Sequence, residues 1–83
     1  MRPEDVLFWL QAQPFQPFRV TLNSGRSFEV RHPELVRLMR TSLLHFTPSN
    51  QEGVFDRAET IGLVLVECIE PLDAATRSSH EHH

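Results

Sequence analysis

The segment from Pro14 to Glu34, PFQPFRVTLNSGRSFEVRHPE, constrains the fold most, because two alternating runs of apolar and polar residues flank a short turn. Every second residue from Phe18 to Leu22 is apolar, and Phe28 and Val30 continue this alternation after the turn. A period of two is typical of strands with one buried face. The segment therefore predicts an antiparallel β-hairpin.

The length of the turn sets the register of this hairpin. A two-residue loop would pair Val20 with Glu29 and mix the two faces, since a slip of one residue turns every side chain over. A three-residue loop, Asn23 to Gly25, pairs Val20 with Phe28 and places Arg19 opposite Glu29. The glycine that ends this loop suits the left-handed conformation required there. A five-residue loop also keeps the apolar residues on one face, but it places Arg19 opposite Arg31. We therefore predict the three-residue loop.

The residues before the hairpin predict a short amphipathic helix over Met1 to Gln13. Pro3 suits the first helical position, and Glu4 and Asp5 complement the helix dipole in the first turn. The apolar face contains Val6, Leu7 and Leu10, broadened by Phe8 and Trp9. We expect such a helix to lie across an open end or face of a sheet.

The rest of the chain predicts further short strands. Leu35 to Met39 and Leu43 to Phe46 have extended patterns, and Phe55 to Ile69 is apolar on both parities, so both of its faces need cover. The fold class expected is mainly β with an N-terminal α-helix, as a small five-stranded antiparallel bent sheet or partly open barrel. We expect one domain over residues 1–73 and a disordered C-terminal tail over 74–83.

The composition argues against a disulfide and against a membrane span. Cys68 is the only cysteine, and a single thiol in an apolar strand fits a reducing compartment. No apolar stretch, Leu63 to Val66 included, approaches the roughly 20 residues of a membrane-spanning helix. We therefore expect a cytoplasmic protein that has no membrane association.

Charge is divided unevenly along the chain, although the net charge is only −3. Residues 19–40 contain five arginines and two glutamates, whereas residues 50–73 contain six acidic residues and one arginine. Ion pairs within the molecule, head-to-tail association of subunits and a basic face for an acidic partner all fit this division. A solvated surface on which charges happen to segregate is the simplest alternative.

Part of the hairpin resembles the opening strands of Sm-like proteins, through the spacing V-x-L-x-x-G-R-x-F-x-V from Val20 to Val30. The resemblance implies an N-terminal helix, a five-stranded bent barrel of the SH3-like kind and RNA binding by a ring of subunits. The RNA-holding motifs of that family differ here. His32 to Val36 replaces an Asp-x-x-Met-Asn loop, and Ile61-Gly62 lacks the basic residue of an Arg-Gly pair.

A second likeness covers most of the chain. It resembles a set of small bacterial proteins without an established activity, which share PFxPFxVxLxxGRxFxVxHPE and a closing IEPL, here Ile69 to Leu72. This resemblance implies a compact bacterial domain and leaves the function open.

Several histidines are candidates for chemistry. His32 and Glu34 flank a proline, and a histidine near a carboxylate suits acid–base chemistry, but no nucleophile or orienting group accompanies them. His45 lies in a strand pattern and is expected on its polar face. Imidazoles close together bind Ni²⁺ or Cu²⁺, and the C-terminal tail carries His80, His82 and His83. A tail without fixed geometry does not make a specific metal site, so we predict no metal. We also predict no enzyme activity and no cofactor.

Nucleic-acid binding is the other chemistry to consider. The aromatic residues that would either fill the core or stack on bases are Trp9, Phe15 and Phe18. Phosphate contacts would then come from arginines in turns and at outward strand positions, namely Arg26, Arg37 and Arg40. The acidic net charge disfavours a general nucleic-acid binder, because such binding depends on neutralising phosphates.

The sequence therefore favours a small non-enzymatic protein-interaction module. We expect it to form a homo-oligomer through an apolar face of the last strand or through an open sheet edge. The alternative is a divergent Sm-like RNA-binding ring protein, which would show a contiguous arginine patch and an affinity that falls steeply with salt.

Overall fold

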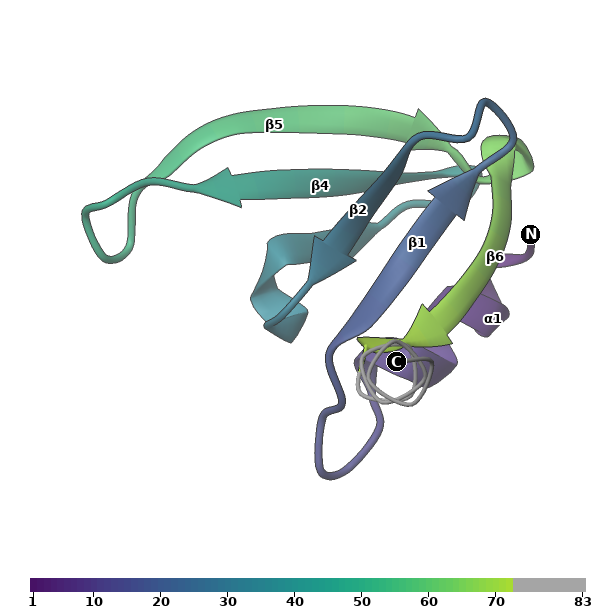
Figure 1. The fold of residues 1–83 in the computed structure, drawn as a ribbon, viewed down its shortest axis with the longest axis horizontal. Helices are drawn as coiled ribbons and strands as arrows, with labels where there is room; N and C mark the ends of the chain where they lie inside the picture. Colours follow the sequence, from purple (N-terminus) through teal and green to yellow (C-terminus); the bar gives the residue numbers. More distant parts are fainter. Residues whose placement is uncertain (73–83) are drawn as a thin grey trace, which may run out of the picture.

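The computed structural model describes residues 1–72, as one helix followed by six strands. The helix α1 spans Pro3–Leu10. The strands are β1 (Phe18–Leu22), β2 (Ser27–Val30), β3 (Val36–Leu38), β4 (Ser42–Pro48), β5 (Phe55–Gly62) and β6 (Val66–Pro71). Two short 3₁₀ turns precede β3 and β6, namely η1 (Pro33–Leu35) and η2 (Leu63–Leu65) (Figure 1). The domain boundary expected at residue 73 and the tail expected over 74–83 lie outside the described residues.

The strands form two antiparallel sheets of three strands each. The β1 sheet has the order β2–β1–β6, and the β4 sheet has the order β3–β4–β5. The chain passes between them twice, from β2 through η1 to β3 and from β5 through η2 to β6 (Figure 1). The expected mainly β architecture with an N-terminal helix is confirmed, but over residues 1–72 the two sheets do not close into a barrel.

The structure has six strands rather than five because η2 divides the run from Phe55 to Ile69. The turn moves the chain from the β4 sheet to the β1 sheet, so the residues before and after it share no common face. Val66 is buried, whereas Val64 is 78% exposed and Cys68 is exposed. Apolar residues occur at both odd and even positions of this run because the chain changes from one sheet to the other within it. The expectation of one strand covered on both faces is therefore wrong.

The β1–β2 hairpin has the predicted register. The opposite pairs are Phe18 and Val30, Arg19 and Glu29, and Val20 and Phe28. The amide of Leu22 donates a hydrogen bond of 2.8 Å to the carbonyl of Arg26, which closes a three-residue loop. Gly25 ends this loop with a φ of +93°. Local turn chemistry therefore defines this part of the fold.

Buried residues from both sheets and from α1 form one apolar core. Its fully buried members include Phe18, Val30 and Leu43. The helix contributes Val6, with Trp9 and Leu10 packed at the margin, while Leu7 is exposed. The apolar face of α1 is therefore rotated from the expected face, and α1 is shorter than the 13 residues expected.

The three aromatic residues considered for base stacking belong to this core. The ring centroids of Trp9 and Phe15 lie 5.6 Å and 5.9 Å from that of Phe18. Phe18 is completely buried, and Trp9 and Phe15 are partly buried against it, so the three rings pack on one another at the core rather than forming an open platform for bases.

We expect Leu43→Ala to lower the free energy of unfolding by about 2–5 kcal/mol, because it leaves a cavity in a fully buried site. Leu65→Ala is the matched control. It removes the same atoms from a side chain that is 49% exposed and should cost about 0.5 kcal/mol or less. Urea denaturation followed by tryptophan fluorescence measures both losses. Equal losses would contradict this description of the core.

Gly25→Ala should destabilise the protein by roughly 1–2 kcal/mol, because a Cβ atom is strained at positive φ. Gly62→Ala provides the comparison, since Gly62 has a φ of −64° and an added Cβ would meet only Val64 at 3.8 Å. Thermal melting of the two variants should therefore show a lower Tm for Gly25→Ala alone. A comparable decrease for Gly62→Ala would mean that the strain does not lie in the turn.

Candidate functional site

β4 and β5 form a long hairpin that projects from the rest of the molecule (Figure 1). In β5, Phe55 to Ala58 and Thr60 are exposed, and Ile61 is buried. In the strand order β3–β4–β5, one side of β5 pairs with β4 and the other has no strand partner within residues 1–72. This side, the β5 edge, presents unpaired backbone amides and carbonyls, which can pair with another chain.

Exposed apolar side chains lie at both ends of β5. At the tip of the hairpin, Phe55 is 41% exposed beside the exposed Val54, and its ring centroid lies 5.2 Å from that of Phe46. At the base, Val64 and Leu65 of η2 are exposed. These residues give the β5 edge apolar surroundings that a partner can cover.

An ion pair between Arg26 and Glu59 joins the two sheets. Arg26 follows the β1–β2 turn, and its Nη2 donates a hydrogen bond to Oε1 of Glu59 on β5. This hydrogen bond raises the pKa of Arg26 and lowers the pKa of Glu59. The contact also connects the basic and acidic parts of the sequence. Arg19 and Glu70, 3.7 Å apart, also pair the basic part of the sequence with the acidic part. Ion pairs within the molecule therefore neutralise some of the charges that are unevenly divided along the chain.

His45 on β4 lies opposite Glu59 and stacks on the ring of Phe28, with ring centroids 4.1 Å apart. Partial burial lowers the pKa of His45, and Arg26 also lowers it, while the Glu59 carboxylate opposes both by raising it. Partial burial therefore favours the neutral form of the imidazole. The sequence placed His45 on a polar face and missed this stacking, because Phe28 belongs to the other sheet.

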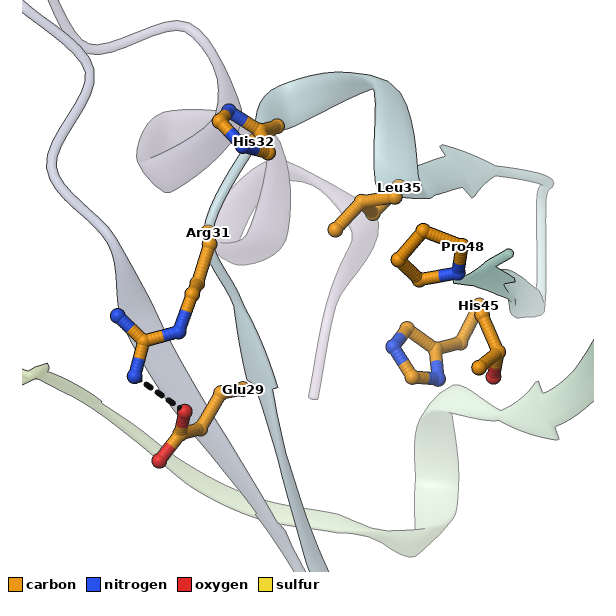
Figure 2. A pocket seen from close by; sticks show the side chains of 7 residues that line it. Glu29, Arg31, His32, Leu35, His45 and Pro48 are labelled. Carbon is orange, nitrogen blue, oxygen red and sulfur yellow. Dashed lines mark hydrogen bonds and ion pairs between the residues drawn. The ribbon is translucent and has the colours of Figure 1, made fainter. Parts of the chain in front are cut away.

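A cleft of about 350 Å³ lies beside His45, between the end of β2, η1 and β4 (Figure 2). The lining residues are Glu29, Arg31, His32, Leu35, His45, Thr47 and Pro48. Arg31 donates a 2.7 Å hydrogen bond to Glu29 on one side, and His45 and Pro48 lie on the other (Figure 2). The cleft is near the lower limit of volume for small-molecule sites.

The structure separates the residues considered for acid–base chemistry. His32 lines the cleft, whereas the exposed Glu34 lies in η1 and does not line it. Thr47 and Pro48, which the sequence did not single out, line it instead. Within residues 1–72, no group of three or more His, Cys, Asp and Glu side chains is arranged to hold a metal ion. The three C-terminal histidines lie outside the described residues.

The three arginines considered for phosphate contacts occupy different parts of the molecule. Arg26 reaches β5, whereas Arg37 is exposed on β3, at the opposite edge of the same sheet. Arg40 follows β3 and lines a separate hollow of about 420 Å³ together with Met1 and Leu63. In the described part of the chain, Arg37 and Arg40 form no ion pair.

We expect His45 to make the stability of the protein depend on pH. Its pKa is lowered in the folded state from the usual value of 6.5, so protons bind preferentially to the unfolded chain below that pH. Stability is thus complete above about pH 6.5 and falls as the pH decreases toward the folded-state pKa. His45→Gln should lose less stability than the wild type between about pH 7.5 and pH 5.5.

Urea denaturation at each pH measures this difference. His32→Gln is the matched control, because it removes an exposed histidine from the same cleft and leaves the stacking of His45 on Phe28 in place. If His45→Gln keeps the wild-type dependence, the partial burial of His45 against Phe28 does not lower its pKa.

Two further observations complete the description of the chain. No helix in residues 1–72 has both the length and the apolar character needed to cross a membrane. Comparisons with protein-family models, curated proteins and solved structures find no match to this chain.

Proposed function

We propose that this protein is a small non-enzymatic interaction module that self-associates into a homo-oligomer. The β5 edge is the observation that carries the proposal, because eight residues of strand lie at an unpaired side of a sheet and most of their side chains are exposed. Such an edge is a template for pairing with another strand. The exposed apolar residues at its two ends support the same use.

The topology supports an Sm-like or SH3-like arrangement for the fold. β1 pairs with both β2 and β6, so the last strand returns to lie beside the first. A 3₁₀ turn precedes this last strand, and a helix precedes the first. We propose on these grounds that the two sheets are the halves of a partly open barrel, in which β2 and β3 act as one bent strand across η1.

The alternative function is a divergent Sm-like RNA-binding ring. It is favoured by Arg37, Arg40 and Arg57, none of which forms an ion pair within residues 1–72. Arginines without an acidic partner are suited to phosphate contacts. Arg26 supports this function less, because Glu59 occupies its guanidinium.

Native molar mass measured by light scattering tests the proposal. We expect a mass that is a multiple of the 9.6 kDa chain, at low and high salt and with or without a mixed RNA pool. A mass of one chain at every protein concentration would contradict self-association. A ring-sized mass that increases with RNA only at low salt would instead establish the alternative, since phosphate contacts weaken as salt rises.

A further inference from the structure

The β5 edge is accessible along most of its length. β5 lies on the outer margin of the projecting hairpin, and the described chain has no strand beyond it (Figure 1). The side chains from Phe55 to Ala58 are exposed, so no side chain of this segment is committed to the core. A second strand can therefore approach this segment without displacing buried residues.

Symmetry limits how two copies of β5 can pair. In an antiparallel pair about a two-fold axis, directly opposite residues point to the same side of the sheet. Because side chains alternate along a strand, the axis must pass through a residue rather than between two residues. Each register is then defined by the residue that lies opposite its own copy.

The charges on β5 distinguish these registers. An axis through Asp56, Arg57 or Glu59 places that charge directly opposite the same charge, which is destabilising. An axis through Thr60 leaves Glu59 opposite an apolar residue. An axis through Ala58 places Arg57 opposite Glu59 twice, once on each side of the axis. Charges on an edge strand usually oppose pairing, but within β5 the register centred on Ala58 is the one that sets opposite charges against each other.

We propose that β5 pairs with β5 of a second copy of this chain, antiparallel and with the two-fold axis at Ala58. Arg57 of each copy then lies opposite Glu59 of the other. The two β4 sheets join into one continuous sheet of six strands, three from each copy. This inference rests on the proposed self-association and specifies its surface, its symmetry and its register.

The geometry of the two charged residues fits this pairing. Arg57 has no acidic partner in the part of the chain that the structure describes. Glu59 accepts the hydrogen bond of Arg26 on Oε1, so Oε2 remains able to accept a hydrogen bond from Arg57 of the second copy. On the opposite face of β5, Asp56 meets Thr60, whose hydroxyl is a suitable donor to a carboxylate.

Charge reversal with complementary variants tests this register. Arg57→Glu sets the introduced glutamate against Glu59 of the second copy, and the native mass should fall to one chain. The double variant Arg26→Glu with Glu59→Arg preserves the ion pair between the sheets but sets the introduced arginine against Arg57. It should also be monomeric. An equimolar mixture of the two variants should recover the dimer mass, because every opposite pair then has complementary charges.

Arg37→Glu is the matched control, because it makes the same change of charge on β3, at the far edge of the same sheet. It should keep the dimer mass. Light scattering gives the mass of each sample, and far-ultraviolet circular dichroism verifies that each variant is folded.

The possible results separate this inference from the function on which it rests. If the wild type has the mass of one chain at every concentration, the proposed self-association fails. If the wild type is a dimer and Arg57→Glu remains one, self-association stands and pairing through β5 is wrong. If both variants are monomers but their mixture gives no dimer, the register centred on Ala58 is wrong.

Discussion

The structure depends on two short 3₁₀ turns, because each one moves the backbone from one three-stranded sheet to the other. A strand can bury only one face against a given sheet, so a chain of this length needs two sheets to enclose a core. η1 and η2 provide the crossings and also contribute Leu35 and Leu63 to the buried residues. They thus allow Phe18 and Leu43, from different sheets, to lie in one apolar cluster.

The accuracy of the sequence predictions follows the distance over which interactions act. The register of the β1–β2 hairpin was predicted because it depends on features within a few residues of one another. These features are the alternation of apolar and polar residues, the length of the turn and the glycine at position 25. The stacking of Phe28 on His45 was not predicted, since the two residues belong to different sheets and no local pattern connects them. The cleft beside His45 was missed for the same reason. Strand patterns give the faces of an element, and only the tertiary fold decides which faces meet.

Charge has two roles in this molecule. Arg26 and Glu59 form an ion pair between the two sheets, and Arg19 lies between Glu29 and Glu70. These contacts are exposed, so each one contributes little to stability. Arg57 has no such partner in residues 1–72, and it lies on the strand whose edge is open. The proposed interaction surface follows from this coincidence of an unpaired backbone and an unpaired charge.

The pairing of β1 with β6 also has a consequence for the folding of the chain. β1 is the central strand of its sheet, and one of its neighbours comes from the far end of the described residues. The two hairpins, β1–β2 and β4–β5, need only short loops and can form early. The β1 sheet is completed only when β6 closes a loop of more than 40 residues, and such distant contacts slow folding. During synthesis, the strand that begins the fold therefore waits for its second partner until almost all of this domain has left the ribosome.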